Sequence, residues 1–60
     1  MYAWFEVRYH GGAAAVRAKS EEDAKKLYLS FNGYLDDIPG IEVKRIDCEE
    51  PESKYWNVIR

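Results

Sequence analysis

The sequence predicts an α+β fold in which one helix packs on a mainly antiparallel sheet of three to four strands. Three features predict it: two alternating runs around a Gly-Gly pair, a capped amphipathic helix after them, and a strand after a Pro-Gly turn. Sixty residues suffice for a single small domain, residues 1–60. Short, uncrossed connections favour the strand order 2-1-3, with a fourth strand outside the third.

The first two strands are expected to form a β-hairpin. Apolar residues alternate with polar ones from Ala3 to Tyr9 and again after the glycines. Gly11-Gly12 suits a two-residue turn because glycine accepts positive φ without steric cost. A phosphate-binding loop is disfavoured, since a strand rather than a helix follows the glycines. The expected pairs are Tyr9 with Ala14, Val7 with Val16, Phe5 with Ala18, Glu6 with Arg17 and Trp4 with Lys19.

A helix is expected to begin after Ser20, whose hydroxyl can accept a hydrogen bond from a backbone N–H three residues on. The acidic run Glu21–Asp23 complements the positive end of the helix dipole. Asn32-Gly33 is a suitable C-terminal stop. The expected apolar stripe is Ala24, Leu27, Tyr28 and Phe31. It would pack on the small side chains of the hairpin, which include Ala14 and Ala18.

The last third of the chain is expected to contain a loop and two strands. Residues 34–40 form the loop, and Ile41–Cys48 reads as a strand whose apolar residues change parity after Val43. Two explanations remain open: a β-bulge at Lys44-Arg45, or partial cover on both faces. Tyr55–Arg60 is a candidate fourth strand.

Composition argues against most catalytic chemistry. The chain has one cysteine, Cys48, and one histidine, His10, so it offers neither an intrachain disulfide nor an ordinary zinc site. His10 is expected to flank the turn, and Cys48 to be a passive thiol. We therefore expect no enzyme activity, no cofactor and no metal. A free cysteine and the absence of a long apolar run favour a cytoplasmic protein without a membrane partner.

Two surfaces are candidates for binding a partner. The uncovered sheet face is expected to carry Trp4, Arg8, Arg17 and Lys19. The second surface is an acidic rim made of Asp36, Asp37, Asp47, Glu49, Glu50 and Glu52. Aromatic and basic side chains on an open sheet can bind RNA by stacking and by phosphate contacts. The net charge of −2 favours a protein partner over RNA. Alternatively, Trp4 packs beneath Trp56 or in a homodimer that also buries Ala13 and Ala15.

The segments "VRAKSEEDAKKLY" (residues 16–28) and "IEVKRIDCEE" (residues 41–50) resemble the DpnD/PcfM-like proteins, short accessory proteins of phages and plasmids. The chain is also similar to the archaeal ribosomal protein of the LX type. The resemblance implies no catalytic residues. It implies a mobile-element accessory protein that works by binding, and an expected function as an inhibitor of a bacterial nucleic-acid-handling complex, in the manner of anti-CRISPR proteins. A small RNA-binding protein is the alternative.

Overall fold

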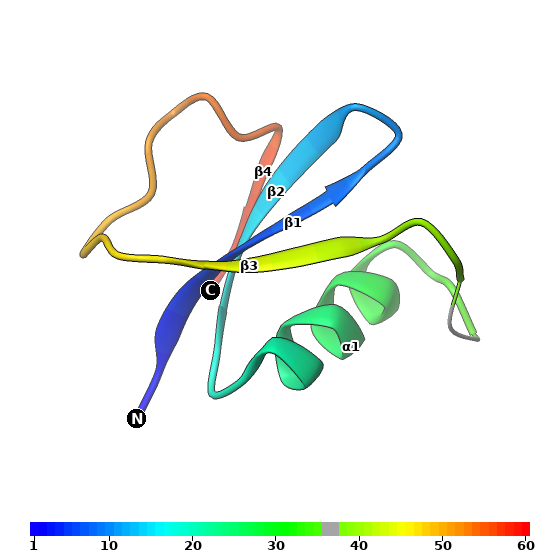
Figure 1. The fold of residues 1–60 in the computed structure, drawn as a ribbon, viewed down its shortest axis with the longest axis horizontal. Coiled ribbons are helices and arrows are strands. Elements are labelled where there is room, and N and C mark those ends of the chain that lie inside the picture. Colours follow the sequence, from blue (N-terminus) through cyan, green and yellow to red (C-terminus); the bar gives the residue numbers. More distant parts are fainter. Residues whose placement is uncertain (36–37) are drawn as a thin grey trace.

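The computed structural model describes residues 1–35 and 38–60 as a helix packed on a four-stranded mixed sheet. Its elements are β1 (Ala3–Tyr9), β2 (Gly12–Ala18), α1 (Glu21–Phe31), β3 (Glu42–Ile46) and β4 (Asn57–Ile59). The strand order is β3-β1-β2-β4, and only β4 pairs in parallel, with β2. Figure 1 shows α1 on one side of the strands and the connection between β3 and β4 on the other.

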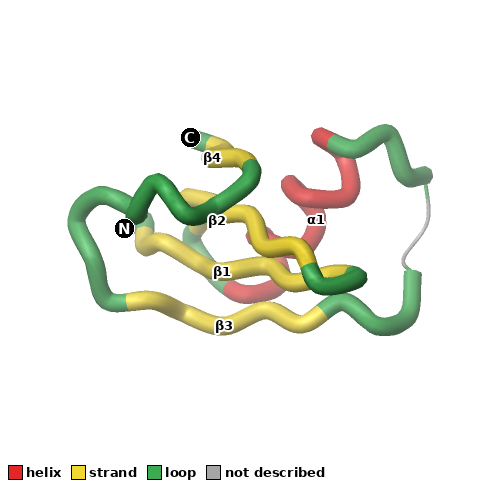
Figure 2. Tube along the Cα trace, turned by 90° about the horizontal axis from the view of Figure 1, so that it is seen from above, coloured by secondary structure: helices red, strands yellow, loops and turns green. Residues whose placement is uncertain are grey.

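The predicted α+β class and the order of the first three strands are confirmed, but the predicted place of the fourth strand is wrong. The strand at Asn57–Ile59 lies beside β2, not outside β3. The connection 47–56 runs from the β3 edge to the β4 edge, and Figure 2 shows it passing on the side of the sheet away from the helix. In this position Ile59 pairs with Val16 and packs against the core.

The hairpin is confirmed, but its predicted turn and register are wrong. The turn residues are His10 and Gly11, with φ of 52° and 77°, and Gly12 already belongs to β2. Two positive φ values at the centre of the turn match the twist of the strands, and histidine tolerates this region better than most residues. Every predicted pair is displaced by two residues, so each side chain keeps its face.

The observed register ends the strand pairing before Ser20, so Ser20 is available to cap the helix. Ala3 pairs with Ala18, whereas the predicted register would have placed Ser20 opposite Ala3. Ser20 instead accepts a hydrogen bond from the Asp23 backbone N–H at 3.1 Å, as predicted. The shift also removes the predicted pair of Glu6 with Arg17.

Strand β3 contains no bulge. Its register with β1 is continuous from Trp4 opposite Ile46 to Arg8 opposite Glu42. Val43 packs against the core on the helix side, while Ile46 lies on the other side beside Trp4. Both residues are half-buried, so the parity change in the sequence reflects partial cover on both faces.

Helix α1 ends in a Schellman motif at the predicted position. The Tyr34 N–H donates to the Leu29 carbonyl at 2.9 Å, and the Gly33 N–H donates to the Ser30 carbonyl at 3.1 Å. Gly33 has a φ of 79°, the left-handed conformation that this motif requires. The turn brings the chain back along the last turn of the helix.

The predicted helix stripe is only half right. Ala24 and Tyr28 are buried in the core, whereas Leu27 and Phe31 are 42% and 57% exposed. A single helix on a small sheet buries only the narrow strip that faces the strands. The shared core on that face consists of Phe5, Val7, Ala14, Val16, Ala18, Ala24 and Tyr28.

The buried Tyr28 makes stability sensitive to alkaline pH. Burial raises the pKa of its hydroxyl, and Tyr34 and Tyr9 raise it further. A raised pKa in the folded state stabilises the fold fully below the unfolded pKa of about 10, and this contribution is lost as the pH rises through the folded pKa. We expect Tyr28→Phe to reduce the alkaline loss of stability, measured by urea unfolding on both sides of pH ~10. An unchanged alkaline loss in this variant would contradict the assignment.

Candidate functional site

The outer face of the sheet, opposite the helix, is covered by the chain itself at Trp4 and Ala15, so Trp4 is not the exposed stacking residue that was predicted. Trp4 is only 6% exposed, and its indole N–H donates to the Glu49 carbonyl oxygen at 3.0 Å. Ala15, which was expected on a free surface, is fully buried. Trp56 does not lie over Trp4. Its ring approaches Gly12, and its backbone N–H donates to the Ala13 carbonyl at 3.1 Å.

The cations of this face surround a tyrosine rather than a tryptophan. The Arg17 guanidinium lies 5.2 Å from the centroid of the Tyr2 ring, and the Lys19 amine lies 5.6 Å from it. Tyr2 is 56% exposed. The guanidinium of Arg60 lies 5.5 Å from the Trp4 ring. Trp4 lies opposite Arg17 and not opposite Lys19 as predicted. Trp4 is buried, and Tyr2 is the exposed ring.

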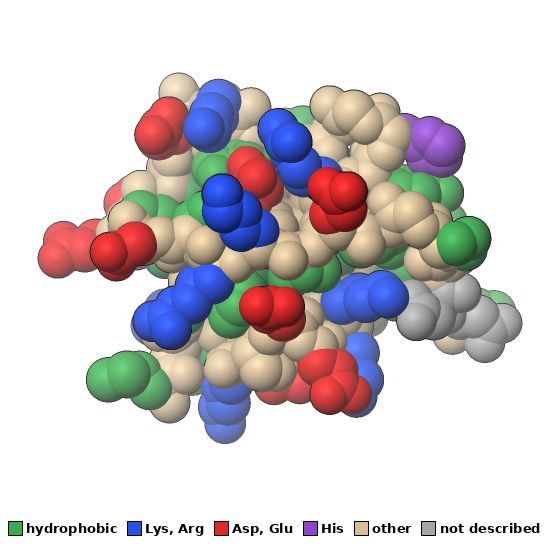
Figure 3. All heavy atoms as spheres, viewed as in Figure 1, with side chains coloured by type: hydrophobic (Ala, Val, Ile, Leu, Met, Phe, Trp, Pro, Cys, Tyr) green, Lys and Arg blue, Asp and Glu red, His purple; other side chains and the backbone are tan. Residues whose placement is uncertain are grey.

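The turn after β3, residues 47–52, carries four exposed acidic residues: Asp47, Glu49, Glu50 and Glu52. We call this turn the acidic arch. Figure 3 shows acidic side chains projecting at the end of the molecule where this turn lies, on the left. Glu50 pairs with Arg60, and this hydrogen bond lowers the pKa of the Glu50 carboxyl. Glu52 pairs with Lys54 at 3.8 Å. Within the part of the chain that the structure describes, Asp47 and Glu49 form no ion pair.

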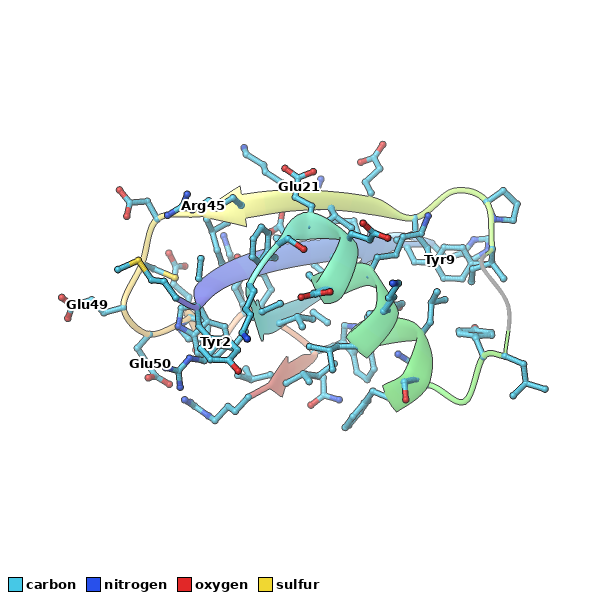
Figure 4. All side chains as sticks on the ribbon, turned by 90° about the horizontal axis from the view of Figure 1, so that it is seen from below. Tyr2, Tyr9, Glu21, Arg45, Glu49 and Glu50 are labelled. Atoms are coloured by element: carbon cyan, nitrogen blue, oxygen red, sulfur yellow. The ribbon has the colours of Figure 1, made fainter. Side chains whose placement is uncertain are left out.

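The two predicted surfaces meet at one hollow. Its volume is about 350 Å³, and it is lined by Tyr2, Ala3, Trp4, Arg17, Cys48, Glu49, Glu50 and Arg60. Figure 4 shows Tyr2, Glu49 and Glu50 gathered at this end of the molecule. The sheet face and the acidic rim, which the sequence presented as alternatives, are therefore neighbours here.

Four of the predicted residues that the structure describes do not line this hollow: Arg8, Lys19, Asp47 and Glu52. Arg8 lies towards the other end of β1, where its Nε is 3.5 Å from a carboxylate oxygen of Glu6. Glu6 also contacts Tyr55, and the pKa of the Tyr55 hydroxyl is raised by burial and then by this carboxylate. Asp36 and Asp37 lie outside the described residues.

The two residues considered for catalysis lie in different turns, His10 in the hairpin turn and Cys48 in the turn after β3. The His10 ring meets the Tyr9 ring edge-on, with centroids 4.2 Å apart, and belongs to the hairpin turn. Cys48 is an exposed free thiol. Over residues 1–35 and 38–60, no three His, Cys, Asp or Glu side chains are close enough to hold a metal ion.

Tyr2 and Arg60 are the site residues that the sequence did not reveal. Tyr2 has the parity of Trp4 and could have been placed on the outer face from the alternation alone. Arg60 reaches Trp4 only because β4 lies beside β2, and that position follows from the crossing of residues 47–56.

In comparisons with known proteins, no family model, curated protein or solved structure matches this chain. Across the described residues, no helix has the length and apolar character needed to cross a membrane.

Proposed function

We propose that this chain is a non-enzymatic binding module that presents the acidic arch to a basic surface of a protein partner. The main support for this proposal is that Trp4, on the central strand β1, is buried beneath the arch, and its indole N–H donates a hydrogen bond to the arch backbone. Trp4 is thereby withdrawn from stacking with a base, while the acids of the arch remain exposed.

The chemistry of the arch indicates the class of partner. Two of its four acids are paired with cations of the same chain, and Asp47 and Glu49 are left to interact with solvent or a partner. Exposed carboxylates speed association with a basic surface, and opposite charges across an interface fix its register. A protein surface that binds nucleic acid has this character. We therefore propose that the chain inhibits a nucleic-acid-handling complex by occupying its phosphate-binding surface, as a mobile-element accessory protein would.

One observation supports a second candidate function, RNA binding. Tyr2 is exposed and is flanked by Arg17 and Lys19, an arrangement in which a base could stack while the cations meet phosphates. This surface contains one exposed aromatic ring. It also lies next to the acidic arch, whose negative charge weakens the attraction of Arg17 and Lys19 for phosphate.

The test compares two neutralising double variants with equal charge changes. Asp47→Asn/Glu49→Gln removes the unpaired acids of the arch, and Glu21→Gln/Glu22→Gln removes two acids at the start of the helix. Proteins captured from nuclease-treated bacterial lysate are purified and tested for loss of their own nucleic-acid binding. We expect association to slow about tenfold or more for the arch variant and to change little for the helix variant.

The same proteins are then titrated with labelled single-stranded RNA. Wild-type binding that falls steeply with salt and vanishes in Arg17→Glu/Lys19→Glu would favour the second candidate. Equal inhibition by the wild type and the arch variant would refute the first.

A further inference from the structure

Strand β3 presents an open edge of the sheet. It pairs with β1 on one side and is the outermost strand on the other. In Figures 2 and 4 no described segment lies beyond this edge. The opposite edge differs, because the Val58 N–H on β4 is already bonded to the side-chain oxygen of Asn57 at 2.9 Å.

The register identifies which backbone groups of β3 point outward. Tyr9 and Gly12 close the two-residue turn, so alternate residues of β1 from Tyr9 backwards bond to β2 and the others bond to β3. Trp4, Glu6 and Arg8 therefore face Ile46, Lys44 and Glu42. The N–H and C=O groups of Val43 and Arg45, between these positions, point away from the sheet.

We propose that a second copy of this chain docks antiparallel along β3, on a two-fold axis that passes Val43. The two sheets then join into one sheet of eight strands. Val43 faces Val43 of the second copy in a hydrogen-bonded pair, and Arg45 faces Ile41. In the intervening pairs, Glu42 faces Lys44 of the second copy, and Lys44 faces its Glu42.

The charge pattern selects this register over its neighbours. Centring the axis on Glu42, Lys44 or Arg45 would set identical charges directly opposite each other, which is destabilising. Among pairs formed within β3, only the axis at Val43 gives two of opposite charge, and it places them in the non-hydrogen-bonded positions, where side chains are closer. Charged residues on an edge strand usually discourage pairing with another chain. Here the spacing of Glu42 and Lys44 places opposite charges face to face when two copies of the edge pair.

The dimer places its two acidic arches at opposite ends of the shared strand pair. Asp47 follows β3 directly, four residues beyond the axis at Val43. Two such residues across an antiparallel pair lie roughly 27 Å apart along the strands. The arches remain exposed, so the dimer neither requires nor prevents the proposed inhibition.

The first test is a charge-reversal series measured by sedimentation equilibrium and native mass spectrometry. We expect the wild type to dimerise, and both Lys44→Glu and Glu42→Lys to weaken its dimer about tenfold or more. A mixture of these two single variants should form heterodimers, because each facing pair is again of opposite charge. Each reversal also places a like charge opposite a residue of β1 in the same chain, because Lys44 lies opposite Glu6 and Glu42 opposite Arg8. Mixing the variants restores opposite charges between chains but leaves this repulsion within each chain. Recovery of the dimer in the mixture therefore shows that the lost contact lay between the chains.

The second test is cross-linking in a Cys48→Ser background. A hydrogen-bonded antiparallel pair has Cα atoms about 5.5 Å apart, within the range of a disulfide. Val43→Cys should therefore cross-link to itself under mild oxidation, and the control Val58→Cys on the other edge should not. A wild type that stays monomeric at high concentration, or a dimer unaffected by the reversals, would overturn the proposal. So would equal cross-linking at both edges.

Discussion

Trp4→Ala is expected to lower the free energy of unfolding by about 3–5 kcal/mol, because it removes a large buried side chain and leaves a cavity beneath residues 47–56. A domain of this length has a total stability of roughly 3–9 kcal/mol. The variant should therefore be largely unfolded, or folded only in part, at ordinary temperature. Urea unfolding followed by circular dichroism measures the loss.

The matched variant Trp4→Phe retains an aromatic ring but not the donor to the Glu49 carbonyl. We expect it to cost less, with about 0.5–1.5 kcal/mol of the loss due to the hydrogen bond. Hydrogen exchange should show the loss of protection concentrated at β4 and the acidic arch. Uniform loss across the helix and hairpin would show that Trp4 does not hold the arch.

The local pattern of this sequence determined much of the fold. Alternation placed the correct side chains of β1 and β2 on each face, and Ser20 and Gly33 marked the helix ends because capping depends on neighbouring residues alone. The error in the hairpin was a shift of two residues. Such a shift preserves both faces, so hydrophobic pattern alone could not detect it.

The position of β4 could not be predicted from local pattern because it depends on the path of residues 47–56. Those residues are mainly polar, and the sequence does not show that their backbone would bond to Trp4. Because the crossing of residues 47–56 was not predicted, the outer face was expected to be open, with Trp4, Arg17 and Lys19 exposed on it. The acids of the arch were identified correctly as exposed, since a polar connection after an edge strand has few ways to become buried.

Phe5→Ala is expected to have an equally large effect, about 3–5 kcal/mol, on the opposite face of the same strand. Phe5 is 4% exposed and belongs to the core beneath the helix, where it is the largest side chain besides Tyr28. The same core cluster contains three alanines, whose small side chains cannot fill a cavity left by the ring.

The two aromatic residues should differ in what unfolds with them. Because Phe5 joins the hairpin to α1, Phe5→Ala should lose helical circular dichroism and sheet protection in one cooperative transition. Trp4→Ala should affect the arch and β4 first. Phe5→Leu, which keeps an apolar side chain in place, should cost roughly 1–2 kcal/mol. If Phe5→Ala released the arch while the helix stayed protected, the role of Phe5 in joining the hairpin to α1 would be contradicted.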